Sequence, residues 1–544
     1  APDRVLACAK HWVAYGAAEA GRDYNTTDMS ERTLREVYFP PFKAAVDTGV
    51  GTFMSAFNDL NGIPASANPF TLTKVLRGEW KFDGFVVSDY TAVEELIKHG
   101  LAVDGTDAAQ LALNAGVDME MVSRLYNQHG AELLKSGKLN MATIDEAVRR
   151  ILRIKFRLGL FDHPYADETR ERTVILSPQN RAAAREIAAR SMVLLKNDRE
   201  TLPLSKDVKS IALIGPLADS QADMIGSWSG DGNAADAVTL LAGIKAKVSP
   251  QTKINYAKGC DVKGDSTEGI DEAVRAARKS DVAILAVGES ADMSGEASSR
   301  SSLDLPGRQL DLVKAVQATG KPVIVVLMNG HPLTINWLAE NTPAILETWF
   351  AGTEGGNAIA DVLFGDVNPG GHLPVTFPRT VGQEPLYYNH MSTGRPPDAN
   401  NKYTSKYLDV SWTPLFPFGY GLSYTQFQFS NLQLSSKSIR PDGRLSVSVE
   451  VTNTGKRAGD EVVQLYIHDV AASVTRPVKE LKGFERISLR PGESRRVEFT
   501  LGPQELGFYN REMRFVVEPG EFKVFVGDSS DDERLPASFE VVGR

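Results

Sequence analysis

Gly84-Phe85-Val86-Val87-Ser88-Asp89-Tyr90 is the stretch that decides the fold. Its apolar residues are aromatic and β-branched, follow a glycine, and have the length of a strand that is buried on both faces. Asp89 stands directly after them, at the expected carboxyl end of the strand. Parallel strands between helices have this pattern and often carry functional side chains at that end. We therefore predict a parallel α/β sheet with Asp89 as a functional carboxylate; capping of the turn that follows is the structural alternative.

The same strand-then-helix pattern recurs through residues 1–165. The other predicted strands are Val5–Ala9, Thr52–Phe57 and Gly116–Met119, and helical spacing covers Glu31–Ala45 and Asp107–Asn114. Polar residues stand at the expected strand ends: Lys10, His11, Asn58, Asp118 and Glu120. A (β/α)8 barrel places its chemistry at such ends, but it needs eight units where only four can be counted. We expect the C-terminal half of a TIM-like barrel.

Two further domains are predicted beyond Tyr165. Continuous Val, Ile and Leu runs at 211–214, 282–287 and 323–327 indicate an α/β sandwich with a central parallel sheet. After residue 430 the pattern changes to strict alternation with turn signals between the runs, which is typical of a fibronectin type III-like β-sandwich. The predicted organisation is a barrel half at 1–165, an α/β sandwich at 166–395, an aromatic connector at 396–429 and a β-sandwich at 430–544.

Composition excludes several classes of partner. The 544 residues carry a net charge of -9, which disfavours nucleic acid and anionic membranes. No apolar run approaches the roughly 18 residues that a membrane span needs. Cys8 and Cys260 do not indicate a disulfide framework, and no Cys/His cluster has metal-ligand spacing, so we expect neither metal nor cofactor. The segment Gly352–Gly356 lacks the lysine of a phosphate loop, which disfavours nucleotide binding.

Two carboxyl groups are the candidates for hydrolysis of a glycosidic bond. That reaction needs one carboxylate to attack or to activate water and a second carboxyl group to protonate the leaving oxygen. Asp89 is the first. The second lies in the polar loop Gly288–Arg300, which contains Glu289, Asp292 and Glu296. Loops held by a rigid sheet often carry function, but composition alone leaves these three residues open.

Several segments, in this order, resemble glycoside hydrolase family 3. They are Lys10-His11, Met54-Ser55-Ala56-Phe57-Asn58, Val86-Val87-Ser88-Asp89-Tyr90, Asn114-Ala115-Gly116-Val117-Asp118-Met119, Leu194-Leu195-Lys196-Asn197 and Pro417-Phe418-Gly419-Tyr420-Gly421-Leu422-Ser423-Tyr424. The resemblance covers essentially the whole chain. Glu347–Asn357 and Arg476–Phe484 bring it closest to the bacterial periplasmic β-glucosidase branch.

The resemblance implies roles for individual residues. Asp89 would attack the anomeric carbon and form a covalent glycosyl-enzyme, and Glu296, a few residues before Arg300, would be the general acid/base with a raised pKa. In a retaining enzyme the two carboxyl groups approach to roughly 5–5.5 Å. Lys10 and His11 would bind hydroxyls of the terminal sugar.

The resemblance also implies a set of packing residues around the sugar. Met54 would pack against the sugar, and Tyr90 is a further sugar-binding position next to the nucleophile. Phe57 stands where many members carry a tyrosine, so the hydrogen bond of that hydroxyl cannot form here. Further sugar ligands of the family, an Asp and an Arg, come before the Lys-His pair and are not in this chain. Either a preceding segment or another chain would then complete the barrel.

The predicted function is retaining, exo-acting hydrolysis of terminal non-reducing β-D-glucosyl residues from a small β-glucoside or cello-oligosaccharide, as in cellulose degradation. Two alternatives stay open: a β-xylosidase or exo-glucanase of the same family, and an inactive or incomplete carbohydrate-binding fragment. A β-N-acetylglucosaminidase is disfavoured because Trp12–Gly16 replaces its histidine motif. The resemblance implies a periplasmic or secreted bacterial protein. The aromatic connector suggests a homodimer or, as the alternative, an interdomain core.

Overall fold

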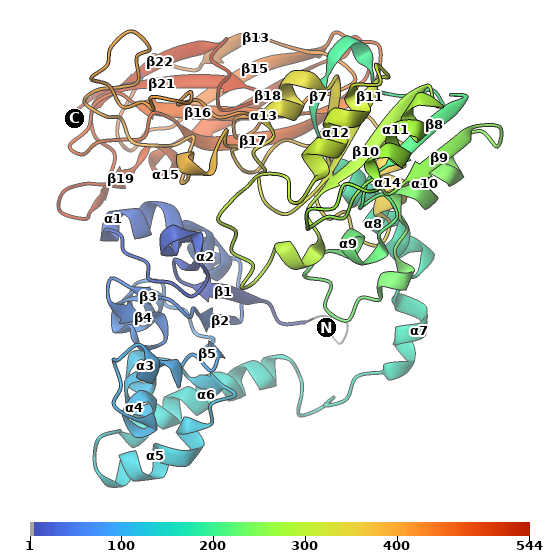
Figure 1. Cartoon of the computed structure of the whole chain (residues 1–544). Helices are drawn as coiled ribbons and strands as arrows, with labels where there is room; N and C mark the ends of the chain where they lie inside the picture. Colours follow the sequence, from blue (N-terminus) through green and yellow to red (C-terminus); the bar gives the residue numbers. More distant parts are fainter. Residues whose placement is uncertain (1–4, 544) are drawn as a thin grey trace. The chain divides into compact units, whose positions relative to one another are not determined.

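A four-stranded parallel sheet organises the first of two compact units, which divide between Glu171 and Arg172 in this computed structural model of residues 5–543 (Figure 1). Its strands are β1 (Cys8–Trp12), β2 (Thr52–Ser55), β5 (Phe85–Tyr90) and β6 (Met119–Met121). They lie side by side in chain order, with Phe53 paired to Val86 and Met54 to Val87. Neighbouring parallel strands in chain order are the arrangement of a (β/α)8 barrel.

Helices and helical turns cover one face of this sheet. They are α1 (Glu31–Thr33), a π-helical segment Leu34–Tyr38, α2 (Phe39–Asp47), a π-helical segment Phe70–Glu79, α3 (Glu95–Lys98), α4 (Gly105–Ala115), α5 (Leu125–Lys135) and α6 (Met141–Arg157); a short hairpin pairs β3 (Asp59–Leu60) with β4 (Ile63–Pro64). Phe53 and Val86 point into this helical side and are fully buried with Trp12. Because side chains alternate along a strand, Met54 and Val87 point to the opposite face.

Two strand predictions in this unit are wrong. β1 begins at Cys8, so Lys10 and His11 lie within the strand, and Val5 is 95% exposed. β6 is Met119–Met121 and not the predicted Gly116–Met119, so Asp118 lies before the strand and not near its carboxyl end. An apolar run shows which residues can be buried, whereas strand bounds depend on where the neighbouring backbone pairs.

A six-stranded mixed sheet forms the first part of the second unit. Its order is β7-β12-β11-β10-β8-β9, and only the edge strand β7 is antiparallel to its neighbour. The strands are β7 (Val193–Asn197), β8 (Ser210–Ile214), β9 (Lys253–Ala257), β10 (Val282–Gly288), β11 (Val323–Met328) and β12 (Ala344–Glu347). The helices are α7 (Glu171–Val174), α8 (Pro178–Ser191), α9 (Gln221–Ile225), α10 (Leu240–Lys247), α11 (Ile270–Arg278), α12 (Gln309–Gln317), α13 (Asn336–Asn341) and α14 (Gly355–Leu363).

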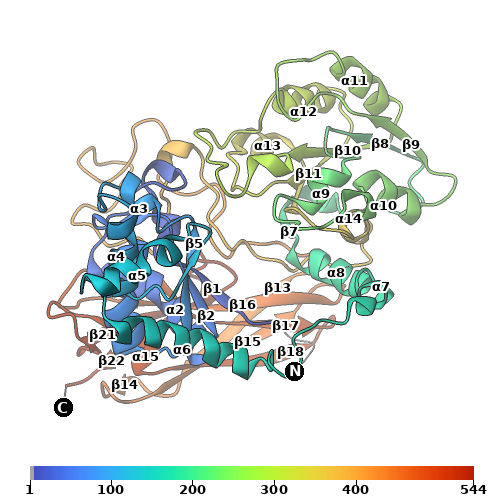
Figure 2. The same ribbon diagram turned by 90° about the horizontal axis from the view of Figure 1, so that it is seen from below.

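Both faces of this sheet are buried, as its continuous apolar strands predict. Figure 2 shows α11 and α12 on one side of the strands and α10 and α14 on the other. Leu213 and Ile284 pack with α10 and α14, while the alternate residues Ala212 and Leu285 pack with α11 and α12. Every residue of β10 is buried. The rigid centre of the sheet therefore carries the loop that follows β10.

A β-sandwich completes the second unit. One sheet contains β13 (Phe427–Leu434), β15 (Leu445–Asn453) and β18 (Ser494–Leu501); the other contains β14 (Ser438–Ile439), β22 (Pro536–Val541), β21 (Gly520–Gly527), β16 (Gly459–Asp469) and β17 (Glu480–Leu489). Between β18 and β21 lie α15 (Pro503–Leu506) and the short pair β19 (Phe508–Tyr509) and β20 (Phe515–Val516). Alternate residues such as Val447 and Leu465 fill the core between the sheets. The predicted fold class is confirmed, and none of the helices in residues 5–543 has the length and apolar character that crossing a bilayer requires.

The aromatic connector divides into a packed part and an exposed part. Phe416 is buried beside Phe377, and the hydroxyl of Tyr424 donates to the Val362 carbonyl at 3.0 Å. Tyr403 is 70% exposed. The C-terminal half of the connector is thus part of the core of the second unit.

Candidate active site

Asp89 lies near the end of β5, on the same face of the sheet as Val87. Its Oδ1 accepts a hydrogen bond from the Tyr90 backbone N–H at 2.7 Å. Its Oδ2 is buried and accepts no well-aligned hydrogen bond from residues 5–543, although His11 Nε2 lies 3.3 Å away. A buried carboxylate oxygen without a hydrogen bond costs free energy, and native structures retain such atoms mainly where they have a function. One oxygen of Asp89 is therefore held in place while the other is available for a ligand.

The structural alternative for Asp89 is not realised. Its side chain bonds the N–H of Tyr90 within the strand, and the next helix, α3, begins only at Glu95. The carboxylate therefore does not cap a helix.

His11 lies at the edge of a small cluster of aromatic rings. The His11 ring lies 5.1 Å from that of Tyr15, and Tyr15 lies 6.2 Å from Phe57. Tyr24 meets Phe57 edge to face at 5.2 Å. Tyr15 and Tyr24 were not predicted from the sequence, because they stand in an irregular loop after β1 that has no periodicity to place them.

The other predicted sugar-binding residues lie on the same strands. Lys10 is exposed next to His11, to which it is joined by a cis peptide bond. Met54 is half-buried on β2, in register with Val87 of β5. Tyr90 follows Asp89 and is 58% exposed. The first unit therefore brings His11 to Asp89 and places Lys10, Met54 and Tyr90 on the strands around them.

Asp118, one of the polar residues expected at the strand ends, is held in a network of structural hydrogen bonds. Its Oδ2 accepts from Arg77 Nη2 at 2.7 Å and from the Val86 N–H at 2.8 Å, and its Oδ1 accepts from Arg150 Nη1 at 2.7 Å. Burial lowers the pKa of Arg77 to about 10, which still leaves this guanidinium charged at neutral pH. Asp118 thus ties α6 and the segment Phe70–Glu79 to β5.

Asn58 and one carboxylate oxygen of Glu120 also hold the backbone and its loops, while the second oxygen of Glu120, Oε2, is buried and accepts no hydrogen bond from residues 5–543. Asn58 is fully buried and donates to Thr27 Oγ1 at 2.8 Å. Glu120 accepts from the Tyr126 N–H at 2.6 Å, at the start of α5. Strand-end position alone therefore does not separate a reactive carboxylate from a structural one.

In the second unit, polar residues gather at the carboxyl edge of the six-stranded sheet. Glu289 follows β10, Asn329 follows β11, and Glu347 ends β12. These strands are adjacent and parallel, so their carboxyl ends meet at one edge, where α/β sheets commonly bind ligands. Glu289 and Glu347 are both fully buried.

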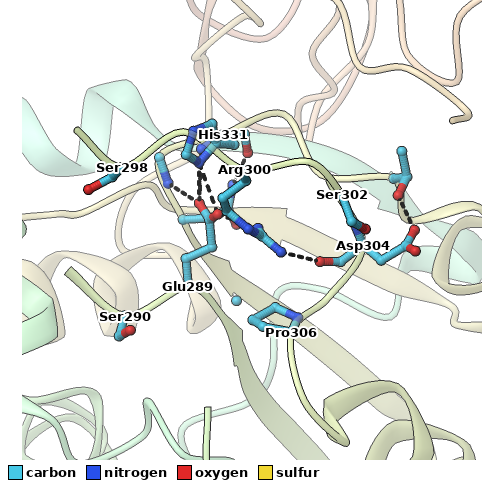
Figure 3. A network of polar contacts seen from close by, with 12 residues as sticks. Glu289, Ser290, Ser298, Arg300, Ser302, Asp304, Pro306 and His331 are labelled. Carbon is cyan, nitrogen blue, oxygen red and sulfur yellow. Dashed lines mark hydrogen bonds and ion pairs between the residues drawn. The ribbon is translucent and has the colours of Figure 1, made fainter. Parts of the chain in front are cut away.

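Glu289 anchors the loop that contains Glu296. It accepts from the Gly330 and His331 N–H groups, each at 3.0 Å, from His331 Nδ1 at 2.9 Å, and from Arg300 Nη1 (Figure 3). Burial by itself would raise the pKa of Glu289, but His331 and Arg300 outweigh burial and hold this pKa below its usual range. Glu289 is therefore an ionised anchor and a poor proton donor.

The two other acidic residues of this loop differ in their surroundings. Asp292 pairs with Lys263 Nζ at 2.5 Å, and this hydrogen bond lowers the Asp292 pKa. Glu296 is exposed, between Gly295 at φ 122° and Ala297 at φ 58°. A general acid must be protonated when the substrate binds, which disfavours Glu289 and Asp292.

Glu347 is a titratable residue at this edge that sequence reasoning did not single out. Its Oε1 accepts from the Trp349 N–H at 2.9 Å and its Oε2 from Asn329 Nδ2 at 3.1 Å. Burial raises the pKa of Glu347 to about 8. Asn329 Nδ2 also donates to the His331 carbonyl at 2.9 Å, so Glu347 is linked to the Glu289 network. The sequence contains a signal for Glu347, the same one that was used for Asp89. Glu289, Asn329 and Glu347 each directly follow or end an apolar run.

Comparisons with known proteins find matches along most of the chain. Residues 2–154 match the glycosyl hydrolase family 3 N-terminal domain, residues 192–424 match its C-terminal domain, and residues 461–530 match a fibronectin type III-like domain. A periplasmic β-glucosidase of Salmonella typhimurium is 50% identical over 97% of this chain and 72% of its own length.

The chain belongs to glycoside hydrolase family 3. This confirms the resemblance inferred from the motifs and makes the protein a glycosidase. The family 3 chain is also 46% identical to a β-xylosidase of Formosa agariphila, over 98% of this chain and 75% of that protein.

Solved structures give the same assignment. A β-glucosidase from Listeria innocua, crystallised as a mutant with laminaribiose, matches the family 3 chain with a TM-score of 0.95 at 43% identity, over 100% of this chain and 74% of the other. The glucose complex of that protein also has a TM-score of 0.95, with 99% and 74% of the two chains covered. Within residues 5–543, no group of three or more His, Cys, Asp or Glu side chains is arranged to hold a metal ion.

Proposed function

We propose that this family 3 enzyme is a retaining, exo-acting β-glucosidase that releases terminal β-D-glucosyl residues from small β-glucosides. The observation that carries the proposal is the 50% identity to a periplasmic β-glucosidase over nearly the whole chain. The Listeria innocua enzyme, crystallised with laminaribiose and with glucose, supports a small glucoside as substrate.

Asp89 is the proposed nucleophile. Its Oδ2 attacks the anomeric carbon, the bond from that carbon to the leaving oxygen breaks, and the proton of Glu296 passes to the leaving oxygen. Ionised Glu296 then takes a proton from water, whose oxygen attacks the anomeric carbon and releases the Asp89 carboxylate. Two inversions at one carbon retain the β-configuration.

The residues near Asp89 are proposed to bind the sugar. Lys10 donates to sugar hydroxyls, and His11, which lies 3.3 Å from Asp89 Oδ2, both orients this carboxylate and contacts a hydroxyl. Met54, Phe57 and Tyr90 offer apolar and aromatic surface to the faces of the ring.

The test of the nucleophile is Asp89→Asn together with a 2-deoxy-2-fluoro-β-glucoside that carries an activated leaving group. We expect turnover of an aryl β-glucoside to fall by about 10³-fold or more, and the fluoro-sugar to label the peptide that contains Asp89 in the parent protein only. Asp83→Asn, an exposed aspartate just before the same strand, is the control and should keep full activity. Full turnover by Asp89→Asn, or a label on another carboxylate, contradicts the proposal.

A β-xylosidase is the second candidate, since the Formosa agariphila relative is 46% identical. The ratio of kcat/KM for an aryl β-glucoside to that for the matched aryl β-xyloside decides between them. A ratio above one favours the glucosidase, because the added hydroxymethyl group then contributes to binding in the transition state.

Location and assembly complete the proposal. The named periplasmic relative supports a periplasmic or secreted enzyme. For the assembly we propose a homodimer formed through the aromatic connector, in which Tyr403 and Tyr407 are exposed, and light scattering at micromolar concentration would reveal it. We also propose that the domains of the chain end at residues 165, 395 and 429.

A further inference from the structure

The loop between β10 and α12 has little regular secondary structure, although Ser290 Oγ donates to Asp292 Oδ1 at 2.5 Å and Ser298 Oγ donates to the Asp292 carbonyl at 3.2 Å. Apart from one helical turn at Ala291–Met293 it is irregular, and small or polar residues surround Glu296. A general acid nevertheless has to stay within hydrogen-bond reach of the leaving oxygen, and a displacement of about 1 Å can reduce the rate by about 100-fold. Some part of the structure must therefore fix the position of Glu296.

Glu289 and Arg300 lie on either side of Glu296 in the sequence and meet in space. Arg300 Nη1 donates to Glu289 Oε1, and Arg300 Nη2 donates to the Asp304 carbonyl at 2.9 Å. Figure 3 shows His331, from the segment after β11, directed at the same carboxylate. Both ends of the segment 289–300, which contains Glu296, are thus fastened to one point at the end of β11. We call Glu289, Arg300 and His331 the clamp.

The end of β10 does not depend on the clamp. Gln309 Oε1 accepts from the Gly288 N–H at 2.8 Å, and Gln309 Nε2 donates to the Gly288 carbonyl at 2.8 Å. Moreover, Glu289 is completely buried and the Arg300 side chain is only 14% exposed, so this ion pair carries a desolvation cost. A buried ion pair often stabilises a fold no better than apolar residues would, so its benefit here is the defined geometry of the loop.

The loop also packs closely on its neighbours. A Cβ atom at Gly330 would lie 2.0 Å from Ser294 Oγ, and one at Gly295 would lie 2.9 Å from Ser227 Oγ. Ser294 is therefore confined by Gly330, which also contributes a backbone N–H to Glu289 of the clamp, and Gly295 is confined by Ser227.

We propose that the clamp positions Glu296 as acid/base and that Glu289 is its central positioning residue. This inference rests on the proposed function, in which Glu296 protonates the leaving oxygen. It predicts that weakening the clamp harms protonation of the leaving group and spares the attack by Asp89.

The test compares Glu289→Gln on two substrates. Phenyl β-glucoside needs its leaving oxygen protonated, whereas 2,4-dinitrophenyl β-glucoside leaves without this help. We expect kcat/KM to fall by about 10- to 100-fold for the phenyl substrate and by less than about 3-fold for the dinitrophenyl substrate. The basic limb of the pH profile of kcat/KM, which reports the pKa of the acid in the free enzyme, should also shift.

Three further variants make the result decisive. Asp292→Asn, in the same loop but outside the clamp, should change neither substrate by more than about 2-fold. His331→Ala removes one hydrogen-bond donor to Glu289. Like Glu289→Gln, it should lower kcat/KM more for the phenyl than for the dinitrophenyl substrate, but by a smaller factor, so the test stays informative if Glu289→Gln folds poorly. Glu296→Ala should show the largest such difference. If Glu289→Gln and His331→Ala lose kcat/KM equally on both substrates, or not at all, the proposed role of the clamp is overturned. If Glu296→Ala shows no greater loss on the phenyl than on the dinitrophenyl substrate, the proposed acid/base itself is refuted.

Discussion

Replacing Asp118 by asparagine tests whether a buried carboxylate holds the strand of the proposed nucleophile in place. The Asp118 side chain is 2% exposed and accepts from Arg77, Arg150 and the Val86 N–H. Val86 belongs to β5, as does Asp89. The substitution keeps the shape of the side chain and removes its charge.

The magnitude follows from the three donors. Asparagine has one acceptor oxygen, so its NH₂ group faces at least one donor whichever way the amide turns. At least one charge-assisted hydrogen bond is lost, and Arg77 and Arg150, whose side chains are 11% and 21% exposed, lose this counter-charge; Arg150 keeps its ion pair with Glu146. Breaking a buried ion pair by removing one partner costs about 3–5 kcal/mol of unfolding free energy.

Asp83→Asn is the matched control. Asp83 pairs with Arg157 of the same helix α6 at 2.6 Å, but its side chain is 58% exposed. A solvent-exposed pair contributes less than about 1 kcal/mol. The two variants therefore differ in burial while sharing the type of ion pair and the helix.

Hydrogen exchange of the peptide that contains Phe85–Tyr90, measured on the full chain, is the assay. A loss of about 3–5 kcal/mol speeds exchange of protected amides by about two to three and a half orders of magnitude, against less than about tenfold for Asp83→Asn. Equal acceleration in the two variants, or protection unchanged in Asp118→Asn, would refute the reasoning that Asp118 secures β5.

Two other predictions concern the second unit. Gly295→Ala should lower turnover of phenyl β-glucoside at least about tenfold, because φ at Gly295 is 122° and the new Cβ would meet Ser227 Oγ at 2.9 Å. Gly320→Ala is the control: φ is 76° there, so the backbone strain is shared, but the space around the residue is open. Equal turnover in the two variants would contradict a local effect on the loop. For Glu347, the folded pKa of about 8 lies above the value in the unfolded chain, so its contribution to stability is complete below about pH 4.5 and is lost as the pH rises through 8. Urea denaturation from pH 6 to pH 9 should therefore show stability falling in the parent protein and falling less in Glu347→Gln; identical slopes would show that Glu347 is already ionised at pH 6.

The sequence by itself determined the fold class, the family and the position of Asp89. These rest on local information: apolar runs of strand length, alternation in the β-sandwich, and motifs of adjacent residues such as Val86-Val87-Ser88-Asp89-Tyr90. Local patterns of this kind reflect burial and strand geometry, which are fixed within a few residues.

Only the tertiary structure decided which polar residues are free to react. Asp118 and Asp89 have the same appearance in the sequence, yet Asp118 is occupied by arginines from two separate helical segments, while one oxygen of Asp89 accepts no hydrogen bond from residues 5–543. Likewise, Glu289 is distinguished from Glu296 by His331, which is 42 positions away in the chain. Ion pairs and hydrogen bonds between such distant residues arise when strands pair and loops meet at a sheet edge, and no local pattern in the sequence records them.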